Sequence, residues 1–176
     1  MRLLRELHAK AIEMNVATIG APTIDVLVQS PSWDGEADAE GTVRQVIARA
    51  SEVIGDPALA GGEVAVLLTD DEAMRTLNAR WRGVDQSTNV LSFPAQQRGM
   101  QGAAVALGDI AIAYSTTARE AAAEGKPFHH HFAHLVVHGF LHLLGHDHET
   151  DEAADVMEHL ERLILARAGV PDPYAT

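Results

Sequence analysis

Three histidines at fixed spacing constrain this 176-residue chain more than any other feature. His138, His142 and His148 follow an H-x3-H-x5-H pattern. Residues four apart on an α-helix differ by about 40° of rotation and about 6 Å of rise, so the imidazoles of His138 and His142 leave the same face. Gly145 can adopt the left-handed conformation that ends a helix, and the chain can then bring His148 back toward the other two. The pattern therefore predicts a metal-binding helix in the C-terminal third of the chain.

The number of histidines indicates which kind of metal site to expect. Three imidazoles leave the fourth position of a tetrahedral zinc ion open, which is typical of catalytic rather than structural zinc sites. We expect one Zn²⁺ per chain, held by His138, His142 and His148. Nickel and copper accept similar ligands, so the choice of zinc is an inference from ligand chemistry.

Other polar residues near the pattern have alternative interpretations. His134 stands one helical turn before His138, so it either replaces His148 as a ligand or supports the site from beside it. Asp147 and Asp109 are candidates to orient a ligand imidazole through a hydrogen bond. The run 129–131 of three histidines is expected to be a solvated first turn of the helix.

The spacing of the three histidines also equals that of the metzincin zinc proteases, H-E-x-x-H-x-x-G-x-x-H. Gly139 stands where that motif has its glutamate, the general base. The sequence therefore predicts the metal ligands of such a protease without its base. A metalloprotease or another hydrolase remains an alternative, and Gly139 counts against it.

Composition limits the classes of partner. The chain has no cysteine, which excludes disulfides and thiolate metal sites. A net charge of −12 argues against a general nucleic-acid binder. The stretch 73–108 nevertheless carries four arginines and one acid, Asp85, which favours a phosphate-facing patch. The stretch 149–172, with seven acids and two arginines, is interpreted as a solvated helix face.

The N-terminus and the hydropathy pattern favour a cytoplasmic protein without a membrane partner. Residues 1–10 are charged and amphipathic, and they lack the apolar region of a secretory signal. The sequence contains no apolar run of about 18 residues, the length that would suggest a membrane span.

The periodicity of apolar residues predicts an α+β fold. Residues 1–20 are predicted to be a helical extension, and residues 21–176 a single domain with a mixed sheet of about four strands and four to six helices. Thr69 and Glu72 fit a capping box at the start of the helix that ends near Arg80. The strands are expected at 23–29, 63–68, 89–93 and 107–113, and the helices at 43–54, 70–80, 115–124, 128–144 and 150–168.

At the histidine pattern the chain resembles a known family. Residues 138–148 read HGFLHLLGHDH and are similar to the YbeY signature, H-G-x-L-H-L-x-G-x-D-H. Residues 78–94 form a second family-like stretch, in which Ser87 stands where a proline is expected. Further family-like pieces lie at 107–110, 124–127 and 172–174, so the resemblance extends over nearly the whole chain.

The resemblance implies a function. YbeY proteins are bacterial metal-dependent endoribonucleases, so it implies a zinc-dependent, single-strand-specific endoribonuclease. Its role would be maturation of the 3′ end of small-subunit (16S) ribosomal RNA and ribosome quality control. The implied partners are single-stranded ribosomal RNA and the small ribosomal subunit, and not DNA. A non-catalytic, ribosome-associated metal protein is a further alternative, which a fourth ligand such as His134 would indicate.

The resemblance also implies that Arg82 is the catalytic residue for RNA cleavage. A guanidinium group has a planar fork that matches two phosphate oxygens. A surface ion pair with Asp85 is the alternative role for Arg82. The sequence leaves open whether water or the RNA 2′-hydroxyl is the nucleophile.

Overall fold

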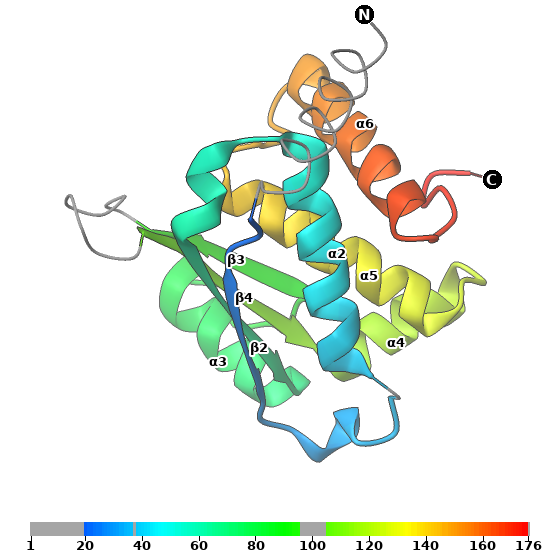
Figure 1. Ribbon diagram of the computed structural model, residues 1–176. Helices are drawn as coiled ribbons and strands as arrows, with labels where there is room; N and C mark the ends of the chain where they lie inside the picture. Colours follow the sequence, from blue (N-terminus) through cyan, green and yellow to red (C-terminus); the bar gives the residue numbers. More distant parts are fainter. Residues whose placement is uncertain (1–19, 37, 96–104, 176) are drawn as a thin grey trace, which may run out of the picture.

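A mixed four-stranded sheet with the strand order β1-β2-β4-β3 lies at the centre of the molecule (Figure 1). The computed structural model describes residues 20–36, 38–95 and 105–175. Strands β1, β2 and β4 run parallel, and β3 pairs antiparallel with β4 at one edge. The strands are β1 (Thr23–Val28), β2 (Gly62–Thr69), β3 (Val90–Pro94) and β4 (Val105–Ala113).

Five α-helices and two short 3₁₀ helices complete the described part of the chain. Together with the sheet they confirm the predicted α+β class. The predicted helix at 1–20 falls, apart from Gly20, outside the described residues, and so does Arg98 of the basic stretch. The helices are η1 (Pro31–Trp33), α2 (Ala39–Ile54), η2 (Pro57–Gly61), α3 (Asp71–Arg82), α4 (Tyr114–Ala123), α5 (Phe128–Leu143) and α6 (Asp151–Arg167).

The first turn of α3 differs from the prediction. Thr69 is the last residue of β2 and is fully buried, so it does not cap the helix. Asp70 is the cap instead, because its side chain accepts a hydrogen bond of 2.9 Å from the backbone N–H of Ala73. A carboxylate at this position also complements the partial positive charge of the helix N-terminus.

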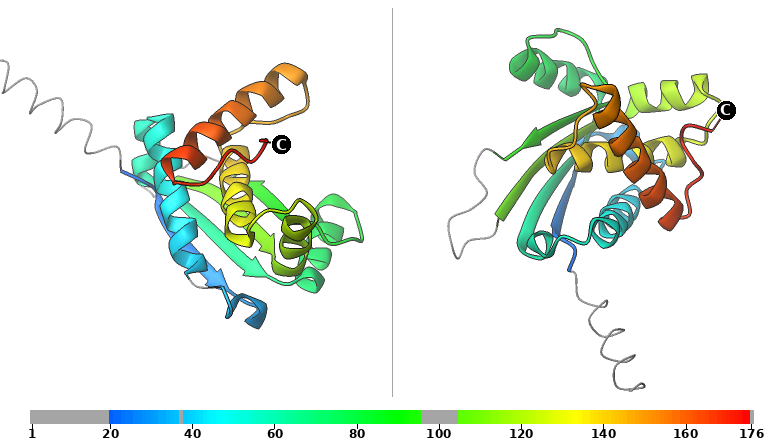
Figure 2. Two further views of the ribbon diagram at one scale, coloured as in Figure 1. Left: turned by 90° about the vertical axis from the view of Figure 1, so that its right-hand side faces the viewer. Right: turned by 90° about the horizontal axis from the view of Figure 1, so that it is seen from above.

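Helices cover the two faces of the sheet unequally (Figures 1 and 2). Since side chains alternate along a strand, Ile110 and Ile112 join the main core beneath α2 and α5, whereas Ala111 and Ala113 face α3. Helix α6 packs outside α2 and α5. Burying a large apolar side chain contributes about 1.5–3 kcal/mol, so the main core supplies most of the stabilisation.

Helix α5 packs unusually close to the edge of the sheet. An added Cβ at Gly139 would lie 3.0 Å from Ile110 Cγ2 and 3.1 Å from Ser92 Oγ. The Ser92 hydroxyl donates a hydrogen bond of 3.1 Å to the Gly139 carbonyl oxygen, which ties α5 to β3. Although α5 is apolar, none of the helices in the described part of the chain is long and apolar enough to span a membrane.

Helix α5 ends in a glycine-dependent turn. Gly145 has φ = +91°, in the positive region expected from the sequence. Its N–H donates to the carbonyl oxygen of His142, and the N–H of His146 donates to that of Leu141, each at 3.1 Å. These two bonds form a Schellman motif, which satisfies carbonyl groups at the helix end and reverses the chain direction.

The turn yields a prediction. Gly145→Val should lower the free energy of unfolding by about 1–3 kcal/mol, because a β-branched residue disfavours positive φ. No atom lies within 4 Å of an added Cβ at Gly145, so the penalty is conformational rather than steric. Gly145→Asn is the matched control, since asparagine tolerates this conformation. Equal denaturation midpoints for the two variants would contradict the explanation.

Candidate metal centre

The fold brings His138, His142 and His148 into one group. One ligand nitrogen from each lies within 4.8 Å of the others. The ring centroids of His138 and His142 are 4.5 Å apart, and His148 lies 5.5 Å and 5.2 Å from them. His138 and His142 are half-buried on α5, whereas His148 is exposed in the segment that follows the turn. The group is therefore open to solvent on the His148 side.

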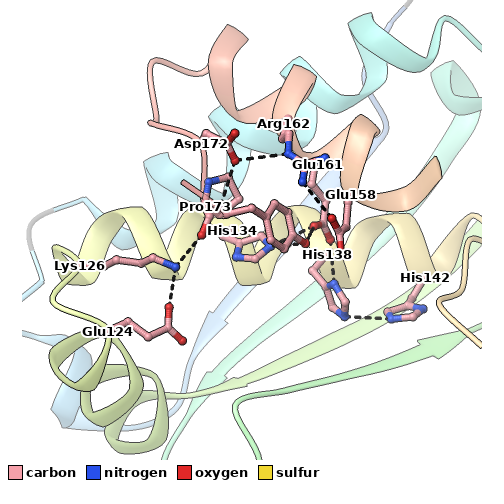
Figure 3. A network of polar contacts seen from close by, with 11 residues as sticks. Glu124, Lys126, His134, His138, His142, Glu158, Glu161, Arg162, Asp172 and Pro173 are labelled. Carbon is pink, nitrogen blue, oxygen red and sulfur yellow. Dashed lines mark hydrogen bonds and ion pairs between the residues drawn. The ribbon is translucent and has the colours of Figure 1, made fainter. Parts of the chain in front are cut away.

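Hydrogen bonds define the tautomers of the first two histidines. His138 Nδ1 lies 2.8 Å from Glu161 Oε1 (Figure 3). His142 Nδ1 lies 2.9 Å from the carbonyl oxygen of His146. An ionised carboxylate and a carbonyl oxygen can only accept, so each Nδ1 carries the proton. In a ring that carries its one proton on Nδ1, Nε2 presents a lone pair, the form in which imidazole binds metals.

The two lone pairs face each other. His138 Nε2 and His142 Nε2 are 3.0 Å apart, and in these tautomers neither carries a proton to share. Such a contact is repulsive unless a cation lies between the nitrogens. Two nitrogen ligands of a tetrahedral zinc ion are about 3.3 Å apart, close to the observed separation. The residues present thus fit a metal ion of the zinc type.

Electrostatics also favour the ligand form of His142. Burial lowers the pKa of His142, and the neighbouring His138 lowers it further. A lowered pKa keeps the imidazole neutral at physiological pH, which metal binding requires.

A residue that the sequence interpretation missed lies behind the histidines. Glu161 of α6 is 0% exposed, although the acidic stretch was predicted to be a solvated helix face. Burial would raise the pKa of Glu161, but hydrogen bonds from His134, His138 and Tyr174 outweigh it and hold the pKa at about 2. The group is thus an ionised acceptor at physiological pH. Periodicity offered a signal, because Met157, Glu161 and Ile164 share the buried face of α6.

The chain segment after α6 closes this region. The Tyr174 hydroxyl donates a hydrogen bond to Glu161, and the guanidinium of Arg162 lies 4.7 Å from the centre of the Tyr174 ring. Lys126 Nζ donates a bond of 2.6 Å to the Pro173 carbonyl oxygen (Figure 3). The family-like pieces 124–127 and 172–174 therefore meet beside the histidines.

The structure decides between the alternatives for His134, which lies beside the site, and corrects the roles predicted for Asp147 and Asp109. His134 lies outside the group of three histidines and donates to Glu161 Oε2 at 3.1 Å. Asp147 accepts from the backbone N–H of Glu149, so the acceptor that orients His142 is the carbonyl oxygen of His146 instead. Asp109 lies on the sheet face opposite α5 and does not support the histidines.

The histidine run at the start of α5 is not entirely solvated. His131 is 6% exposed, contrary to the prediction, and its Nε2 lies 3.0 Å from Glu120 Oε2. This contact between a buried histidine and a partly exposed carboxylate is separate from the group of three histidines.

Arg82 and the histidines are not brought together. Arg82 ends α3 and lines a groove of about 830 Å³ on the sheet face opposite α5, beside Trp81 and Phe93. The rings of Trp81 and Phe93 are 5.8 Å apart. Asp85 pairs with Arg75 at 2.6 Å, so the alternative ion pair with Arg82 does not form. Within the described residues Arg82 makes no hydrogen bond or ion pair.

Comparisons with known proteins identify similar sequences and a similar fold. A Rhodopseudomonas palustris protein named Endoribonuclease YbeY is 56% identical over 156 residues, covering 88% of this chain and 82% of the relative. A protein of the same name from Bradyrhizobium diazoefficiens is 51% identical over 174 residues, covering 95% and 94%. A solution structure from Thermotoga maritima has a TM-score of 0.53 and 22% identity, covering 88% of this chain and 100% of its own, which bears on the fold alone.

The family profile decides the classification. The profile described as Endoribonuclease YbeY matches residues 28–169, most of the chain. The match spans α5, the histidine group and Glu161, and it confirms the resemblance found in the sequence. The chain therefore belongs to the YbeY endoribonuclease family.

Proposed function

We propose that this protein is a zinc-dependent endoribonuclease that cleaves single-stranded RNA during maturation of the 3′ end of small-subunit ribosomal RNA. Family membership supports RNA cleavage, since the relatives are named endoribonucleases. The observation that carries the metal assignment is the 3.0 Å approach of the Nε2 atoms of His138 and His142, while the Nδ1 atom of each ring lies against a separate acceptor. We further propose a cytoplasmic location, contact with the small ribosomal subunit and a part in ribosome quality control.

The residues of the proposed site have distinct roles. His138, His142 and His148 would hold the ion, which supplies a Lewis acid for phosphate and lowers the pKa of water that it polarises. Glu161 and the carbonyl oxygen of His146 accept the Nδ1–H of two of the imidazoles and so orient the rings, with each Nε2 directed toward the ion. The exposed side of the group at His148 leaves room for a phosphodiester to approach.

Contact with both Arg82 and the histidine group would require the RNA to follow a particular path. The edge strand β3 separates the two regions, with Ser92 bonded to Gly139 of α5 and Phe93 packed against Trp81 of α3. RNA that reaches both regions crosses this edge. The Trp81 side chain is 62% exposed and offers a stacking surface for an unpaired base, beside a guanidinium that binds phosphate. An extended single strand suits this path better than a rigid duplex.

The alternative functions receive less support. Gly139 faces Ile110 and Ser92 at about 3 Å, so the glutamate of a metzincin protease has no room at that position. His134 donates to Glu161 and does not complete a fourth position in the group of three histidines, as a structural metal site would need.

The first test concerns the metal. Wild-type protein should bind about one zinc ion per chain, and His142→Ala should lose affinity by more than the roughly 10- to 100-fold typical of removing an outer partner. His159→Ala is the matched control, because His159 is an exposed histidine of α6 outside both possible metal groups. Zinc content is measured by elemental analysis and affinity by chelator competition. A full complement of zinc in His142→Ala would refute the assignment.

The second test separates a nuclease from a protease. Arg82→Ala should keep zinc and fold but lower kcat/KM for RNA cleavage by about 10- to 100-fold, because a hydrogen bond to a charged phosphate is worth about 1.5–3 kcal/mol. Arg49→Ala controls for the loss of one positive charge, because Arg49 lies on α2 and pairs with Glu52. Rates are measured on single-stranded RNA and on an unfolded protein substrate.

The salt dependence of RNA binding is an independent measure of the contact between Arg82 and phosphate. Binding of RNA to the wild type should weaken as salt rises, because counterions compete for the phosphates, and Arg82→Ala should show a shallower dependence. Unchanged RNA cleavage by Arg82→Ala would disprove its contact with phosphate. Digestion of the protein substrate with intact RNA would instead establish a protease.

A further inference from the structure

The burial of the charged Glu161 carboxylate is energetically unfavourable and calls for an explanation. It is the only carboxylate among the fully buried residues that the structure describes. Moving a carboxylate from water into a protein interior costs several kcal/mol unless the charge is paired and hydrogen-bonded. Replacing such a group by a hydrophobic residue is often neutral for stability, so stability alone does not account for a carboxylate at this position.

The contacts of Glu161 are arranged around one metal ligand. Oε1 receives the Nδ1–H of His138 at 2.8 Å, while Oε2 receives His134 Nε2–H at 3.1 Å and the Tyr174 hydroxyl. One oxygen thus serves His138 alone, and the other is held by two donors. Tyr174 is itself fixed by the Arg162 guanidinium against its ring.

We propose that Glu161 is a positioning residue of the metal centre, in which its carboxylate fixes the tautomer and ring direction of His138 while His134 and Tyr174 hold the carboxylate still. The inference rests on the proposed metal site at His138, His142 and His148. With its proton on Nδ1, His138 must present the Nε2 lone pair toward His142, 3.0 Å away. Outer partners of this kind orient a ligand imidazole and increase its basicity.

A second metal ion is the competing explanation for this cluster. His134, His138 and Glu161 also have ligand atoms within 4.8 Å of one another. Both histidines, however, must donate a proton to a carboxylate that can only accept, and the same nitrogens cannot then bind a cation. The positioning role therefore predicts one zinc ion per chain rather than two.

Two substitutions test the role, each with a matched control. Glu161→Gln keeps the shape but places a donor where an acceptor stood, so it cannot accept all three bonds. Tyr174→Phe removes only the hydroxyl and lies at a 37% exposed position, so it leaves the fold intact. Glu120→Gln removes a carboxylate bonded to the buried His131, and Tyr114→Phe removes a hydroxyl bonded to Glu36.

Two measurements report on positioning. Zinc affinity should fall about 10- to 100-fold in Glu161→Gln and about 2- to 10-fold in Tyr174→Phe, with both controls close to wild type. In the metal-free protein, long-range ¹H–¹⁵N spectra of the imidazoles should show His138 with its proton on Nδ1, and a mixture of tautomers in Glu161→Gln. Thermal unfolding confirms that each variant is folded.

The outcomes are distinguishable. Wild-type affinity with an unchanged His138 tautomer in Glu161→Gln would overturn the positioning role, and so would equal losses in Glu120→Gln. Binding of two zinc ions by the wild type, reduced to one in Glu161→Gln, would make Glu161 a ligand instead. If the wild type binds no zinc, the proposed metal function fails, and the tautomer spectra still decide whether Glu161 controls His138.

Discussion

The structure depends on the way helix α5 packs against its neighbours. Its apolar side chains pack against the sheet and against α2, and its remaining stripe carries His134, His138 and His142 toward α6. Histidines only one helical turn apart cannot move independently, so the direction of the whole helix sets the direction of the imidazoles. The close contact at Gly139 anchors that direction to the edge of the sheet.

The histidine group is supported by parts of the chain that contribute none of its three histidines. Glu161 comes from α6 and Tyr174 from the segment beyond it, and Lys126 holds that segment from before α5. Each contact is short and directional. The hydrogen bonds to Glu161 compensate the charge of its carboxylate, which burial alone would disfavour. For the proposed metal site, such pre-organisation would leave little rearrangement of His138 and His142 on binding of a cation.

The sequence predicted the helices and strands better than it predicted the residues that support the histidines. Periodicity located the strands and helices, and the turn at Gly145 followed from the conformational freedom of glycine. Helix α2 begins before the predicted position because Asp38 caps it with φ = +63°, a conformation rare outside glycine. Glu161 was missed because charge was read from a whole acidic run, whereas burial depends on the face each residue occupies. The tautomer of His138 depends on a partner 23 residues away, which no local pattern contains.

The packing at Gly139 has an evolutionary consequence. In the metzincin pattern the residue after the first histidine supplies the base, and a single amino-acid exchange would restore that pattern here. The volume that the new side chain needs is already occupied by Ile110 and Ser92. A side chain at position 139 would therefore require Ile110 and Ser92 to move, since close-packed interiors resist added volume. The histidine spacing shared with the metzincins does not reveal this steric obstacle, which is seen only in the three-dimensional contacts.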